Sequence, residues 1–218
     1  MDPDKRKILS IYVNINKTLY DAQKSNKHCI NMMKDEMQYD GLQILEDISV
    51  NSLNDSLDVL RDEIYKMLQF SHEYLDVLKD IEAVNLYDAA EIIVEIGNIR
   101  RFGSVRHFIS YAGLTLVKYY SKMKSNSNEI VVANKKQKPV DYYENLKIVL
   151  TRCAKKMIYQ SNEYADYYDI CIGSFRQSHP NYPQGRIEVM ALKKVTIRFA
   201  TFIYNEFNKI ADFEEMEK

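Results

Sequence analysis

Apolar residues recur every three or four positions along most of this chain, and this spacing constrains its fold more than any other feature. The clearest case lies within residues 53–81, where one position in the series is the polar Ser71: Leu57, Leu60, Ile64, Met67, Ser71, Tyr74, Leu78 and Ile81. Residues at this spacing share one face of a helix. The chain has only 6 Gly and 4 Pro residues, which favours long helices over tight turns. We therefore predict an all-α fold.

The same spacing predicts further helices over residues 4–37, 42–50, 141–159 and 186–210, and one that begins at Ser161. Asn51 and Ser52 are predicted to form a turn or cap between two helices. Four apolar residues mark the first helix: Ile8, Ile11, Ile15 and Leu19. Six are predicted to be buried in the last one: Val189, Leu192, Val195, Phe199, Ile203 and Phe207.

The apolar face of residues 53–81 must pack against another helix. It fits an antiparallel hairpin with residues 4–37, and it fits a dimerising coiled coil equally well. We therefore expect two parts: a helical hairpin or coiled-coil segment over residues 1–81, and a helical domain over residues 82–218.

Residues 88–121 are predicted to form a helix-turn-helix-like core. Ala89, Ala90 and Ile93 lie at helical spacing, and Gly97 is a natural left-handed end for that helix. Ser104 is a good N-cap for a second helix, which Gly113 ends.

Charge is distributed unevenly along the chain, although its formal net charge is only −1. Residues 1–99 carry 10 basic and 19 acidic side chains, whereas residues 100–156 carry 13 basic and 3 acidic ones. Such a basic block indicates a polyanionic partner or an acidic face of the same protein, and a plain solvated surface is the alternative. The candidate nucleic-acid-binding residues, five of which lie in a predicted loop at 117–139, are Arg100, Arg101, Arg106, Lys118, Lys122, Lys124, Lys135 and Lys136.

A longer motif covers residues 95–115, E-I-G-N-I-x-R-F-x-S-x-x-x-F-x-x-Y-A-G-L-T. It resembles the C-terminal domain of the insertion-sequence transposases of the one-ten/one-sixteen/nine-oh-two group, which typically reads A-E-I-G-D-I-x-R-F-x-S-x-x-x-L-x-x-Y-A-G-L-x-P. The resemblance implies DNA binding, transposition and recombination, with a serine shortly after the A-G-L motif as the nucleophile. Ser121, eight residues after Gly113, is therefore the candidate catalytic residue.

Two departures from the family pattern matter. The family usually has I-P-G-I-G-P near residues 81–88, and its glycines fall on Ala83 and Asn85. Asn can adopt the left-handed conformation but Ala seldom does, so a phosphate contact by this turn is expected to be weak. The family's RNase-H-like metal domain also has no counterpart in this sequence. We therefore expect Ser121 to be inactive in the isolated chain, with no cofactor bound here and divalent metal supplied by a partner domain.

The first functional hypothesis is a truncated or stand-alone transposase domain that binds DNA, with structured RNA as a second candidate partner. The alternative is a catalytically inert helical interaction protein. The resemblance also favours a homo-oligomer through residues 53–81. Three dispersed cysteines, the absence of a signal-like N-terminus and the lack of a long apolar run predict a cytoplasmic protein that binds no membrane.

Overall fold

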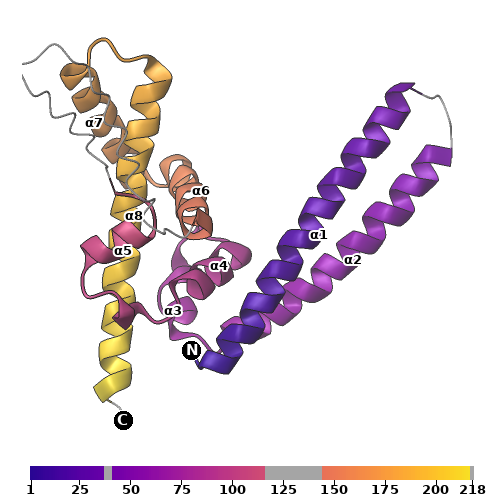
Figure 1. Cartoon of the computed structure of the whole chain (residues 1–218), viewed down its shortest axis with the longest axis horizontal. Coiled ribbons are helices and arrows are strands. Elements are labelled where there is room, and N and C mark those ends of the chain that lie inside the picture. The colour runs from indigo at the N-terminus through magenta and orange to yellow at the C-terminus, as the bar shows by residue number, and fades with distance from the viewer. Residues whose placement is uncertain (37–40, 116–143, 217–218) are drawn as a thin grey trace, which may run out of the picture. The chain divides into compact units, whose positions relative to one another are not determined.

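A computed structural model describes residues 1–36, 41–115 and 144–216. These residues form eight α-helices and two short 3-10 helices, with no strand among them (Figure 1). The all-α prediction is confirmed. The elements are α1 (Pro3–Glu36), α2 (Gly41–Leu68), α3 (His72–Leu75), η1 (Leu78–Asp80), α4 (Leu86–Ile96), η2 (Ile99–Arg101), α5 (Val105–Tyr111), α6 (Glu144–Gln160), α7 (Asn162–Ser178) and α8 (Gln184–Met216).

The chain divides into two compact units. The first comprises residues 1–98 and 209–218, and the second comprises residues 99–208. The expected boundary near residue 81 stays a prediction, as do the coiled-coil and helix-turn-helix assignments.

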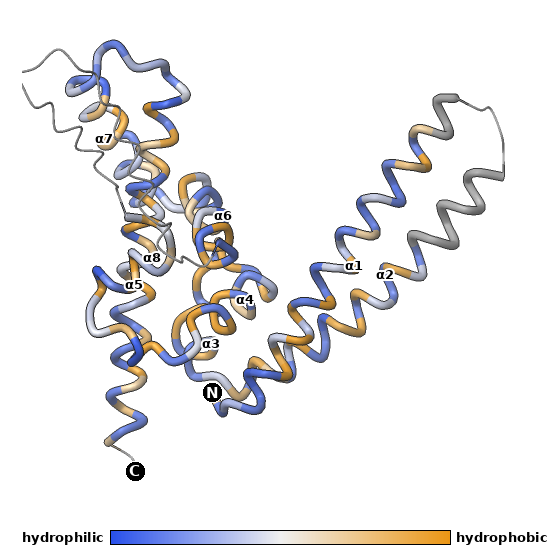
Figure 2. Tube along the Cα trace, in the orientation of Figure 1, coloured by the Kyte–Doolittle hydropathy of each residue, from blue (hydrophilic) through white to orange (hydrophobic). Residues whose placement is uncertain are grey.

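In the first unit, α1 and α2 lie side by side as an antiparallel hairpin (Figure 1). Hydrophobic residues recur along both helices (Figure 2). Leu9 and Ile30 of α1 are buried, as are Leu60, Ile64 and Leu68 of α2. Helix α1 therefore covers the apolar face of residues 53–68 within a single chain. Of the two packing partners considered for this face, the structure shows the antiparallel hairpin with residues 4–37.

Two predicted boundaries around α2 are wrong. Asn51 and Ser52 lie within α2 and do not form a turn. Both side chains are exposed, and a helix tolerates polar residues on its solvent face. The helix also ends at Leu68 rather than near Ile81. Ser71 instead caps α3, its hydroxyl accepting a hydrogen bond from the backbone N–H of Tyr74 at 3.3 Å.

Three of the four apolar residues predicted from the spacing in α1 face solvent, and the fourth, Leu19, is half-buried. Ile8, Ile11 and Ile15 are 43%, 55% and 43% exposed. Helix α1 therefore carries two apolar stripes: one includes Leu9 and faces inward, and the other faces solvent.

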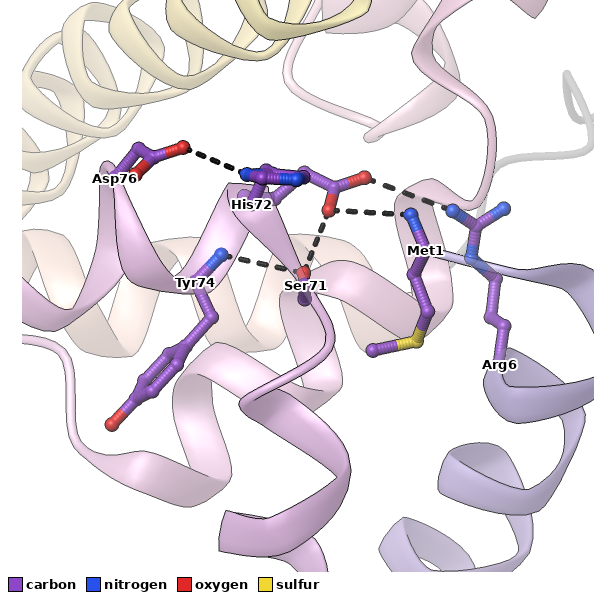
Figure 3. Close-up of polar contacts among 7 residues, drawn as sticks. Met1, Arg6, Ser71, His72, Tyr74 and Asp76 are labelled. Atoms are coloured by element: carbon purple, nitrogen blue, oxygen red, sulfur yellow. Dashed lines mark hydrogen bonds and ion pairs between the residues drawn. The ribbon is translucent and has the colours of Figure 1, made fainter. Parts of the chain in front are cut away.

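Helix α4 provides much of the apolar core of the first unit and contacts α1, α2 and α3. The hydroxyl of Tyr87 in α4 donates a hydrogen bond to the Leu57 carbonyl of α2 at 3.4 Å. A polar cluster also fixes α3 to the start of α1 (Figure 3).

Glu73 lies at the centre of that cluster, with a side chain only 14% exposed. It accepts a 2.6 Å hydrogen bond from the Ser71 hydroxyl, and it lies 3.7 Å from the Met1 ammonium and 3.8 Å from the Arg6 guanidinium (Figure 3). Burial raises the pKa of Glu73, but Ser71 and the two positive charges outweigh burial. The pKa therefore lies below its usual value, and the carboxylate is charged at neutral pH.

The second unit is built on helices α5 to α8. Five residues of α6 are buried: Leu146, Val149, Leu150, Cys153 and Met157. In α8, Val195, Phe199, Ile203 and Phe207 are buried as expected, whereas Leu192 is half-buried. The prediction for Val189 is wrong: it is 66% exposed, and Ile187, two residues earlier on another face of the helix, is buried in its place.

Candidate nucleic-acid interface

The turn before α4 does not have the backbone that a phosphate-binding hairpin needs. Asn85 has φ −79° and ψ 173°, so the left-handed conformation considered for it is wrong. Its side chain accepts a 2.8 Å hydrogen bond from the Asp88 N–H, and the Asp88 carboxylate accepts one from the Asn85 N–H at 3.4 Å. This capping box occupies two amides and places a buried carboxylate where a phosphate would bind.

Helix α4 ends at Gly97 as predicted, and the glycine has a positive φ, but its ψ lies outside the left-handed helical region. Gly97 has φ 63° and ψ −126°, and its N–H bonds to the Ile93 carbonyl at 3.0 Å. An L-residue with a side chain rarely adopts this conformation, so glycine is required for the turn that leads into Arg100 and Arg101. Gly113, with φ 64°, follows Ala112, the C-cap of α5, and the Ser104 hydroxyl caps the start of α5 through the His107 N–H.

Three of the predicted cationic residues lie on η2 and α5. Arg100, Arg101 and Arg106 are all exposed to solvent. Residues 96–115 contain no acidic side chain, although Glu95 immediately precedes them. This segment therefore presents a local excess of positive charge, which suits contact with phosphate groups.

Arg101 is held on an aromatic surface. Its guanidinium carbon lies 4.7 Å from the centre of the Phe102 ring and 4.5 Å from that of Tyr111, and one Nη donates to the Tyr111 hydroxyl at 2.6 Å. Stacking on aromatic rings fixes the plane of a guanidinium, and the hydrogen bond to Tyr111 fixes its direction. The structure thus orders Arg101 before any ligand arrives.

Aromatic packing makes this surface rigid. Phe102 lies edge-on to Phe108, with ring centres 5.2 Å apart, and Phe108 is fully buried. The hydroxyl of Tyr204 in α8 donates to the Phe102 carbonyl at 3.1 Å. The arginine-bearing segment is therefore fixed to the longest helix of the second unit.

Sequence reasoning missed a cationic contact at the end of this segment. Lys193 of α8 donates a hydrogen bond to the Thr115 carbonyl at 3.0 Å. Burial lowers the pKa of Lys193, and the charge of Lys147 in α6 lowers it further. The lysine had no sequence signal beyond its place in the last helix, because its partner is 78 residues away.

The other predicted site residues lie outside the described residues. These are the candidate nucleophile Ser121 and the lysines of the predicted loop, Lys118, Lys122, Lys124, Lys135 and Lys136. Within the described ranges, no three His, Cys, Asp or Glu side chains gather in a group that could hold a metal ion. The predicted partner metal domain stays a prediction.

The described residues thus define an all-α chain with a cationic segment ordered by aromatic contacts. Residues 75–169 match the family described as Transposase IS116/IS110/IS902 family, which connects this part of the chain to a transposase-related role. The match confirms the resemblance drawn from the sequence and includes the whole segment from α4 to α5. No curated protein matches the chain.

The match does not favour the alternative of a pure interaction protein. No helix in the described part of the chain is both long and apolar enough to cross a membrane.

Proposed function

We propose that this chain binds DNA in transposition or site-specific recombination and that the η2–α5 segment contacts the phosphate backbone. The observation that carries the proposal is the stacked Arg101 in an acid-free segment, with the exposed Arg100 and Arg106 beside it. The proposed contact also includes five lysines of the predicted loop: Lys118, Lys122, Lys124, Lys135 and Lys136. Structured RNA is the second candidate ligand.

The test is a titration of the purified chain against labelled duplex DNA and structured RNA, read by fluorescence anisotropy at several salt concentrations. Each phosphate neutralised on a duplex contributes about 0.9 to the slope of log affinity against log salt. Replacing Arg100, Arg101 and Arg106 by Gln should therefore lower that slope by about 2–3. A matched control removes three exposed charges from α1, by Lys7→Gln, Lys24→Gln and Lys27→Gln.

An equal slope in the parent and the arginine variant would show that this segment is only a solvated surface. A second variant, with Lys122, Lys124, Lys135 and Lys136 replaced by Ala, should also weaken binding. The control should bind as the parent does, because α1 lies in the other unit and outside the proposed contact.

Ser121 is proposed as the nucleophile of the reaction, but only when a metal-binding domain outside these 218 residues takes part. A serine hydroxyl needs a base or a metal to become nucleophilic. The isolated chain, incubated with supercoiled DNA and magnesium, should give neither nicks nor a covalent adduct. An adduct that disappears in Ser121→Ala would overturn the proposed inactivity.

We further propose that the protein self-associates through its helical hairpin. The inward stripe is already covered, so the apolar side chains left to meet a second copy are exposed ones, such as Ile8 and Ile11 on α1 and Val59 on α2, the last 66% exposed. Ile11→Asp should shift the chain to monomer in sedimentation velocity, whereas Asn14→Asp, at an exposed polar position of α1, should not. A monomeric parent protein would contradict this proposal.

A further inference from the structure

A second cationic surface lies at the turn between α7 and α8 (Figure 1), outside the residues that match the transposase family. Residues 170–187 contain no acidic side chain, although Asp169 and Glu188 flank them directly and Glu188 accepts a hydrogen bond from the Gln184 side chain at 2.7 Å. Arg176 lies in the last turn of α7 and Arg186 in the first turn of α8, and both are exposed. The turn therefore concentrates positive charge at one position in the second unit.

Arg186 lies at the end of a row of neighbouring aromatic side chains whose rings are tilted against one another. Its guanidinium carbon lies 3.9 Å from the centre of the Tyr182 ring, and the Tyr182 ring lies 4.6 Å from that of His179. Phe175 extends the series, 6.3 Å from His179. Because stacking engages the guanidinium face, the N–H edge of Arg186 remains oriented for a bidentate contact with phosphate oxygens.

The turn is ordered by its own hydrogen bonds. Arg176 donates from Nη2 to the Gln184 side-chain oxygen at 2.7 Å, which uses one of its five N–H donors. His179 N–H bonds to the Phe175 carbonyl at 2.8 Å, and Tyr182 N–H to the His179 carbonyl at 3.1 Å. A methyl group placed on Gly185 would meet no atom within 4 Å apart from its chain neighbours and the backbone of its own helix.

Arg198, in the same unit, is a stacked arginine whose charge is already paired within the protein, and it serves as a comparison. It lies 4.6 Å from the Tyr167 ring centre, but its charge is neutralised by an ion pair with Glu163. No carboxylate in the described part of the chain forms an ion pair with Arg176 or Arg186. Their charge is therefore available to an external anion.

We propose that the α7–α8 turn is a second nucleic-acid contact, in which Arg176 and Arg186 bind the phosphate backbone. This inference rests on the proposed function, because it assumes that the protein binds nucleic acid. It adds a contact surface 75 or more residues along the chain from Arg101, which the family match does not include.

The experiment compares the parent with Arg176→Gln/Arg186→Gln in anisotropy titrations against the same labelled duplex and structured RNA. Loss of two phosphate contacts should lower the salt slope by about 1.4–1.8. Between about 50 and 200 mM salt, the parent's affinity should then fall roughly tenfold more than that of the variant. Lys24→Gln/Lys27→Gln removes the same charge from exposed positions of α1 and should leave the slope unchanged.

The outcomes separate the two proposals. A parent that binds, with an equal slope in the α7–α8 variant, overturns this inference and leaves the proposed function standing. A parent that binds none of the probes overturns both. If the double variant does not fold, by circular dichroism, each single variant should lower the slope by about half as much, and single variants with the parent's slope would refute the contact.

Discussion

Replacing Gly97 by alanine tests the turn that connects α4 to the arginine-bearing segment. At φ 63° and ψ −126°, a residue with a Cβ is strained by its own backbone. The new methyl group would lie 4.0 Å from the nearest Arg6 nitrogen, an ordinary contact. The cost is therefore backbone strain and not a clash with neighbouring side chains.

Residues held in sparsely populated backbone regions cost about 1–3 kcal/mol. Alanine recovers about 0.4–1 kcal/mol by restricting the unfolded chain. The net destabilisation should be about 1–2 kcal/mol. For a chain of this size, that lowers the melting temperature by roughly 2–8 °C.

Gly103→Ala is the matched control for this measurement. Gly103 does not have a positive φ, and its added methyl would lie 3.8 Å from His107 Nδ1, an ordinary contact. This variant should melt at the parent's temperature or slightly above it. If both variants melted at or above the parent's temperature in differential scanning calorimetry, the reasoning from the backbone conformation of Gly97 would be refuted.

Three further changes address the core and the polar clusters. Glu73→Gln should cost about 1–3 kcal/mol at pH 7 in urea unfolding. Because the pKa of Glu73 is lowered on folding, its contribution is present above the usual value of 4.5 and lost as the pH falls further. A gap between parent and variant that did not narrow as the pH was lowered below 4.5 would contradict this assignment. Asn85→Ala removes the capping box and should lower the urea midpoint by the equivalent of about 0.5–2 kcal/mol with an unchanged m-value. Phe108→Ala empties a fully buried site and should cost about 3–5 kcal/mol; a loss under about 1 kcal/mol would show that the site collapses.

Local signals made much of the α4–α5 region predictable. Gly97 and Ser104 act through their own backbone or through a residue three positions away, so the sequence alone identifies the end of one helix and the start of the next. The arginines were predictable for the same reason, since charge composition is read directly from the chain.

The break after Leu68 was not predictable, because the spacing from Met67 to Ser71 to Tyr74 continues the helical pattern. The hydrogen bond from Ser71 to Glu73, and the approach of Arg6 from α1, depend on tertiary structure. Periodicity alone also could not show which of the two apolar stripes of α1 faces α2.

The aromatic surface beneath Arg101 was missed for a related reason. Tyr111 lies ten residues away, and Phe102 and Phe108 are ordinary core residues by sequence. Similarly, the role of His179 was missed, since its stacking partner Tyr182 is recognisable only once the turn is folded.

The hydrogen bond between Lys193 and Thr115 restricts the amino acid at position 193 but not the one at position 115. The lysine contributes its side chain, whereas Thr115 contributes only a backbone carbonyl that every amino acid possesses. Position 115 can therefore change freely without breaking the bond, whereas position 193 must keep a long donor side chain. In a library randomised at both positions, selection for the folded contact should leave a wide range of residues at 115 and mostly Lys or Arg at 193.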